Sequence, residues 1–165
     1  MRPQDVVILL KILTTTEPHW QYRDLASLLS ISVSEISESL NRSHMAGLVD
    51  EKRRRVHRKC LMEFIEHGLH YVFPQAPGSM VTGIPTAHSH NFYAERFASE
   101  LQYVWPADDG NLRGLSVHPL YKSVVKAVKQ DEELYKMLAG IDIIRVGRVR
   151  EMKLAIAELK KVILQ

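Results

Sequence analysis

The segment RDLASLLSISVSEISESLNRSHMAGLV, from Arg23 to Val49, constrains the fold of this chain more than any other. Apolar residues recur at helical spacing on both sides of a short break that runs from Ser30 to Val33. These residues are Leu25, Leu28, Leu29, Ile31, Ile36 and Leu40. Ser34 stands where an N-cap for the second helix is expected, and Gly47 is a residue that commonly ends a helix. The pattern predicts two short helices that share an apolar seam across a tight turn.

The polar residues of the second helix lie outside this seam. They are Ser34, Glu35, Ser37, Glu38, Asn41 and Arg42. Two helices joined in this way form a helix-turn-helix, which places its second helix in the major groove of DNA. In the groove an asparagine can pair with adenine, an arginine can bind guanine or phosphate, and a glutamate can accept a hydrogen bond from cytosine. Serines near the helix N-terminus can donate hydrogen bonds to phosphate oxygens. These six residues are therefore candidate DNA-binding residues.

A run of positive charge follows the second helix. The sequence KRRRVHRK, from Lys52 to Lys59, contains six permanent cations in eight residues, although the formal net charge of the whole chain is only +3. Clusters of this kind suit polyanions, nucleic acid above all, and the alternative is an ordinary solvated surface. The candidate phosphate-binding residues are Lys52, Arg53, Arg54, Arg55, Arg58 and Lys59.

The string from Asp24 to Val49 resembles the winged helix-turn-helix of bacterial transcriptional regulators of the MarR-like group. The resemblance covers about the first 70 residues of the chain. It implies that Arg23–Leu29 is the supporting helix, that Ser34–Ala46 is the recognition helix, and that the chain after Val49 forms the wing. The segment DEKRRRVHRK has no hairpin signal such as Asn-Gly, so a short basic loop is the alternative to a two-stranded wing.

The rest of the chain predicts further helices around one irregular segment. Helical patterns cover 4–13, 60–69, 92–101, 121–129, 131–145 and 148–164, and a short strand is expected at 103–105. The first of these helices is dense enough in apolar residues to pack on more than one side, and Asp131 is expected to cap the helix that follows it. Between Tyr71 and Asn91 three prolines and two glycines interrupt any helical period.

The predicted fold is therefore mainly α and has three parts. A winged helix-turn-helix domain occupies 1–73, an extended linker or arm 74–90, and a C-terminal helical domain for dimerisation or partner binding 91–165. The helix at 148–164 carries a regular apolar stripe, which fits either the dimer contact or ordinary core.

The sequence offers little for catalysis or metal binding. Cys60 is the only cysteine, and His88 and His90 fall short of the three or four converging ligands that zinc needs. No glycine-rich phosphate loop and no catalytic triad is recognisable. The prediction is a protein that is not an enzyme and needs no metal or cofactor. No signal-peptide pattern is present, and no apolar stretch approaches the roughly 18 residues of a membrane span, so a cytoplasmic protein is expected.

These features together predict a sequence-specific transcriptional regulator that binds double-stranded DNA. It is expected to be a repressor acting as a homodimer, because each half-site needs its own recognition helix. The alternative is a protein-binding winged-helix module, such as an antitoxin-like or adaptor protein, that grips a partner through the arm at 80–90 and the C-terminal helices. Salt dependence separates the two functions, since phosphate contacts weaken steeply as salt rises.

Overall fold

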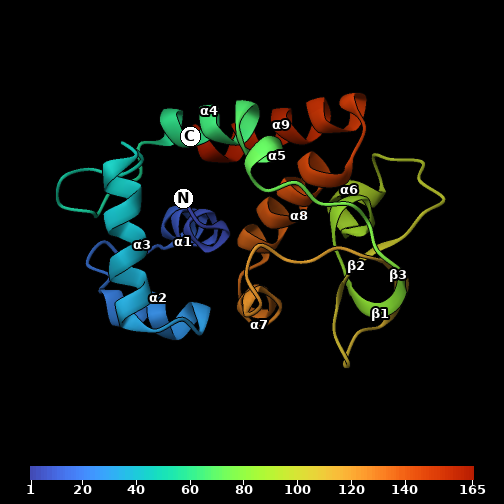
Figure 1. The fold of residues 1–165 in the computed structure, drawn as a ribbon, viewed down its shortest axis with the longest axis horizontal. Helices are drawn as coiled ribbons and strands as arrows, with labels where there is room; N and C mark the ends of the chain where they lie inside the picture. The colour runs from blue at the N-terminus through green and yellow to red at the C-terminus, as the bar shows by residue number, and fades with distance from the viewer.

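The helix at the N-terminus, α1 (Pro3–Thr14), lies at the centre of the fold, between α3 and α8 (Figure 1). The computed structural model of the chain describes all 165 residues, and in it the side chains from Val6 to Leu10 are buried. Helix α1 packs against α2 (Tyr22–Leu29), α3 (Val33–Met45) and α8 (Glu132–Val146). The prediction of a first helix packed on more than one side is confirmed.

Helices α2 and α3 are joined by a tight turn of three residues. Ser30 in this turn adopts the left-handed conformation, with φ of 52°. Ser32 is the N-cap of α3, because its hydroxyl accepts a hydrogen bond from the amide of Glu35 at 3.1 Å, so the prediction of Ser34 as the cap is wrong. The two helices share the predicted apolar seam except at Leu28, which is 44% exposed.

The basic run begins in a short loop after α3. Val49 and Val56 pair in a single antiparallel β-bridge, and the carboxylate of Asp50 closes the loop between them. Its Oδ1 accepts hydrogen bonds from the backbone amides of Arg54, at 2.7 Å, and Arg55, at 3.0 Å. The segment is therefore a minimal hairpin, intermediate between the two-stranded wing and the plain loop that the sequence allows. We call the residues between Val49 and Val56 the basic loop.

The segment for which the sequence predicts an extended arm is part of a small sheet. Its strands are β1 (Met80–Pro85), β2 (Tyr103–Pro106) and β3 (Leu112–Ser116). Strand β1 pairs antiparallel with both other strands, and β2 pairs parallel with β3. Gly83 allows the backbones to approach closely, because a Cβ added there would lie 2.0 Å from the carbonyl oxygen of Trp105. The predicted strand at 103–105 is confirmed, but the second half of the chain is not purely helical.

The remaining helices are α4 (Arg58–His67), α5 (Leu69–Val72), η1 (Ala87–Ser89), α6 (Asn91–Ala94), α7 (Val124–Ala127), η2 (Val128–Gln130) and α9 (Val149–Ile163). The helix predicted at 92–101 is reduced to the single turn of α6. Asp131 caps α8 as predicted, since its side chain accepts a hydrogen bond from the amide of Leu134 at 2.9 Å. The apolar stripe of α9 packs against α4 and α8 of the same chain, so it is core except at Val149, which is 69% exposed.

One continuous hydrophobic core joins the two halves of the chain. It contains residues of α1, α2 and α3 together with residues of α8 and α9. Polar contacts add to it, because Nζ of Lys11 and the hydroxyl of Thr14 each lie 2.6 Å from Oδ2 of Asp131, the N-cap of α8. The α2–α3 pair is therefore fixed to the C-terminal half through α1.

Candidate nucleic-acid interface

Helix α3 presents a polar stripe on the side away from α1. Ser34 and Glu38 are exposed, and Ser37 and Asn41 are half-buried. These residues lie three or four positions apart, so they share one side of the helix. The same side ends at Met45, which is 87% exposed and which the sequence pattern does not reveal, because methionine usually marks a core position. Figure 1 shows α3 at one edge of the molecule. We call these five residues the α3 stripe.

Two of the predicted DNA-binding residues on α3 face α1 instead. Arg42 binds Asp5 through two nitrogen atoms, with Nη2 at 2.8 Å from Oδ1 and Nε at 3.0 Å from Oδ2. Asp5 is completely buried, and this hydrogen bonding raises the pKa of Arg42 above its ordinary value. Glu35 likewise contacts Gln4 and Arg2 near the start of α1. Both side chains join α3 to α1, and the two hydrogen bonds to Asp5 direct the guanidinium group of Arg42 away from a base edge.

Three cations of the basic run are exposed and have side chains that form neither an ion pair nor a hydrogen bond. They are Lys52, Arg55 and Lys59. Two of them belong to the basic loop, which projects beyond α3 in Figure 1. Arg53, in the same loop, is half-buried and has a positive φ of 55°. Burial acts to raise the pKa of Asp50, whereas hydrogen bonds from the backbone amides of Arg55 and Arg54 lower it. The net effect is a pKa below the ordinary value, so the carboxylate that closes the loop stays ionised.

The other two arginines of the run stabilise the fold. The guanidinium group of Arg54 lies over the ring of Trp20, 4.7 Å from its centroid, and over that of Tyr22 at 5.5 Å. It also donates a hydrogen bond to the carbonyl of Trp20. Arg58 donates a hydrogen bond to the carbonyl of Ile163 at 2.9 Å and so joins α4 to the end of α9. Arg54 is exposed but held against the two aromatic rings, and the half-buried Arg58 is held against α9, so both support the candidate interface.

Helix α3 and the basic loop lie at the same end of the molecule, opposite the β-sheet (Figure 1). An α-helix with its side chains is about 10–12 Å across, which matches the width of about 12 Å of the major groove of B-DNA. Hydroxyl, amide and carboxylate groups on the stripe can donate and accept hydrogen bonds at base edges. Lysine and arginine side chains on the loop can bind phosphate oxygens beside them. The arrangement is chemically suited to a duplex.

The two histidines of the HxH motif do not converge on a common site. Nε2 of His88 lies 3.0 Å from Oε2 of Glu151, and Nε2 of His90 lies 3.6 Å from Oε1 of Glu132. The two carboxylates belong to different helices, α9 and α8. No group of three or more histidine, cysteine, aspartate or glutamate side chains is placed to hold a metal ion.

His90 lines a polar cavity of about 370 Å³ together with Glu132 and Tyr135. Burial lowers the pKa of His90 to about 4, and the positive charge of Lys136 contributes to the shift. The imidazole is therefore neutral at pH 7. Its Nδ1 accepts a hydrogen bond from the amide of Phe92 at 3.3 Å, which assigns the proton to Nε2.

The stability of the protein is expected to depend on His90 between pH 6.5 and about 4. In the unfolded chain this histidine binds a proton near pH 6.5, whereas in the folded protein it does so only near pH 4. Stability contributed by the neutral ring is therefore lost as pH falls through this window, by about 2–3 kcal/mol in total. Urea denaturation of the wild type and His90→Gln at neutral and acid pH measures this loss. The variant is expected to lose less, and equal losses would contradict the burial of a neutral imidazole.

No protein-family model, curated protein or solved structure matches this chain. The resemblance to MarR-like regulators therefore depends on the residues of the α2–α3 segment alone. None of the helices is both long enough and apolar enough to cross a lipid bilayer.

Proposed function

We propose that this protein binds double-stranded DNA through a winged helix-turn-helix made of α2, α3 and the basic loop. The observation that carries the proposal is the position of α3, with its polar stripe, beside the basic loop, which bears the exposed, unpaired cations Lys52 and Arg55. In this arrangement α3 enters the major groove, the stripe contacts base edges, and the loop lies on the phosphate backbone.

The proposed contacts fall into two groups. The base-reading residues are Ser34, Ser37, Glu38, Asn41 and Met45. Asn41 suits adenine, Glu38 can accept a hydrogen bond from N4 of cytosine, and Met45 offers an apolar contact to the methyl group of thymine. The phosphate-binding residues are Lys52, Arg55 and Lys59. The second group supplies most of the affinity and the first supplies the sequence preference.

We also propose that the protein represses transcription as a homodimer, because one recognition helix reads one half-site of a two-fold operator. Most of the apolar stripe of α9 packs within its own chain, which leaves only Val149 at its start largely exposed for a dimer contact. The alternative of a partner held by the arm at 80–90 has less support, since every residue of β1 pairs with β2 or β3 and His88 and His90 are buried.

Fluorescence anisotropy on DNA from upstream of the protein's own gene tests the proposal. The expected result is preference for this fragment over a scrambled duplex of equal length, and the preference survives competitor DNA. Equal binding to both duplexes that disappears as salt rises would show only a basic surface and contradict a sequence-specific regulator.

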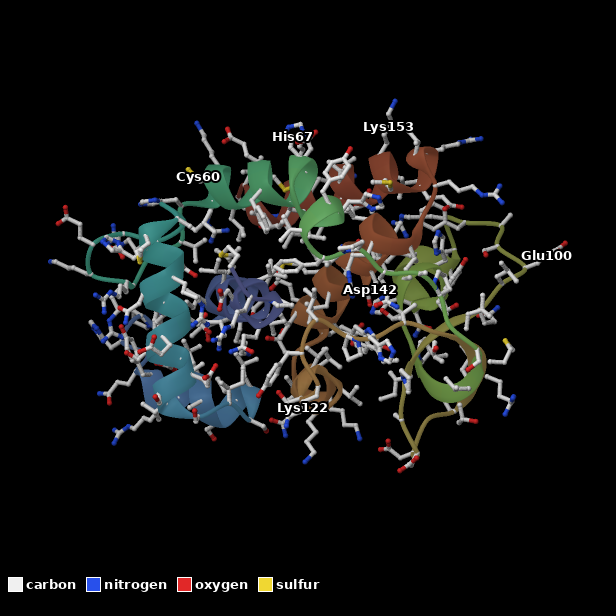
Figure 2. The ribbon with its side chains drawn as sticks, viewed as in Figure 1. Cys60, His67, Glu100, Lys122, Asp142 and Lys153 are labelled. Carbon is white, nitrogen blue, oxygen red and sulfur yellow. The ribbon has the colours of Figure 1, made fainter.

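Removal of two loop cations is expected to weaken DNA binding. In Lys52→Ala/Arg55→Ala the slope of log K against log salt becomes about 1.8 less negative, and the affinity falls about tenfold. Arg150→Ala/Lys153→Ala is the matched control, because it removes two exposed, unpaired cations at the start of α9. Lys153 lies well away from α3 in Figure 2. An equal loss in the control would mean that net charge, and not the loop, determines binding.

A further inference from the structure

Helix α7 and its flanking residues carry three lysines on one side. Lys122 precedes α7, Lys126 lies in α7 and Lys129 lies in η2, and all three side chains line one groove. Lys129 is paired with Asp109, with 2.6 Å between Nζ and Oδ2. Lys122 and Lys126 are exposed and form no ion pair. Figure 2 shows Lys122 at the lower edge of the molecule.

Contacts with α2 fix the position of α7 relative to the helix-turn-helix. The hydroxyl of Ser123 donates a hydrogen bond to the carbonyl of Leu29, the last residue of α2. Val124 and Val128 are buried in the core, and α2 and α7 are in direct contact. The lysines are therefore held at a defined place beside the turn between α2 and α3.

A groove of about 580 Å³ lies between this turn and the loop that joins β2 to β3. Ser30, Lys122 and Lys126 line it from the turn and from α7, and Asp108 and Asp109 line it from the loop. Asp109 is neutralised by its ion pair, so the two unpaired lysines face one unpaired carboxylate. Because Ser30 precedes the N-cap of α3 by two residues, the groove opens beside the N-terminal end of α3.

We propose that Lys122 and Lys126 bind the phosphate backbone of DNA beside the N-terminal end of α3, an inference that rests on the function proposed above. The basic loop follows the C-terminal end of α3, while α7 lies near its N-terminal end (Figure 1). Positive charge therefore stands at both ends of the helix. A helix in the major groove has one phosphate backbone on each side, so the loop binds one backbone and α7 binds the other.

This assignment gives the C-terminal half of the chain a direct role in DNA affinity. Phosphate contacts carry no sequence information, so α7 raises affinity for every duplex alike and sets the register of α3. The buried link of Lys11 and Thr14 to Asp131 keeps the two halves in one fixed arrangement, which the simultaneous contacts require.

The salt dependence of DNA binding by Lys122→Ala/Lys126→Ala tests the inference. The slope of log K against log salt is expected to become about 1.8 less negative than that of the wild type, with about tenfold lower affinity and an unchanged preference among sequences. The Arg150→Ala/Lys153→Ala protein serves again as the control of equal charge. Combining the α7 and loop substitutions is expected to change the slope by the sum of the two effects, about 3.6, since the contacts are separate.

The outcomes distinguish this inference from the function on which it rests. If the wild type binds DNA and the α7 variant behaves like the control, α7 is not part of the interface and the helix-turn-helix proposal stands. If the wild type does not bind DNA, both proposals are overturned. Both lysines are exposed, so the melting temperature of the variant is expected to match that of the wild type, which excludes unfolding as the cause of weaker binding.

Discussion

Replacement of Asp142 by alanine is expected to lower the free energy of unfolding by about 3–5 kcal/mol. Asp142 lies on α8 in the interior of the molecule (Figure 2) and accepts hydrogen bonds from three side chains. Nη1 of Arg145 lies 2.8 Å from its Oδ1, and the hydroxyl of Thr86 and the indole nitrogen of Trp105 lie 2.7 and 2.6 Å from its Oδ2. Alanine leaves a buried guanidinium group and two buried donors without this acceptor, which is the origin of the large cost.

Urea denaturation at pH 7 measures this effect. Asp108→Ala is the control, because that carboxylate is exposed and unpaired, and its effect is expected to stay within about 0.5 kcal/mol. Thr86→Val removes a single donor and is expected to cost about 1–2 kcal/mol, so it keeps the test informative if Asp142→Ala does not fold. An Asp142→Ala protein as stable as the control would mean that the hydrogen bonds accepted by Asp142 do not hold Thr86 and Trp105 against α8.

Replacement of Asp5 by alanine is expected to cost about 2–4 kcal/mol. The carboxylate of Asp5 caps α1 by accepting a hydrogen bond from the amide of Arg2 at 2.7 Å, and it binds Arg42 of α3. Alanine removes the cap and leaves the cation of Arg42 in a partly buried site without its carboxylate partner. The loss is expected to be smaller than for Asp142, because the side chain of Arg42 is 23% exposed.

A second substitution separates the contributions of Asp5. Arg42→Met in the Asp5→Ala background is expected to restore part of the stability, since no unpaired cation then remains against α1. A double variant that is no more stable than Asp5→Ala would contradict the importance of the pair. Arg42→Met alone is expected to lower stability and to leave the preferred DNA sequence unchanged, because Arg42 is bound to Asp5 and does not reach the bases.

The helices around the turn could be predicted because their signals are local. Apolar spacing identifies α2 and α3, and the outward direction of the α3 stripe follows from the same period. The error in the N-cap has an equally local cause. Ser32 and Ser34 are both able to cap a helix, and the sequence does not decide between two serines two residues apart.

The sheet could not be predicted because its strands are short and their partners are distant. Strand β1 pairs with segments that begin at Tyr103 and Leu112, more than 15 residues further along the chain. Gly83 and Pro85 weaken its local strand pattern, and the close contact that requires Gly83 exists only after the strands have paired. A strand of this kind therefore looks like an irregular segment in the sequence.

The sequence by itself determined α2 and α3, the polar side of α3 and the concentration of positive charge after it, because each depends on residues a few positions apart. Only the tertiary structure decided which cations are exposed. Arg42 binds Asp5, 37 residues away, and Arg58 binds a carbonyl 105 residues away. Packing likewise brings Lys122 and Lys126 next to Ser30 in the turn between α2 and α3. Local periodicity assigns a side chain to one face of a helix, but whether that face meets solvent, a carboxylate or another helix depends on how distant elements pack.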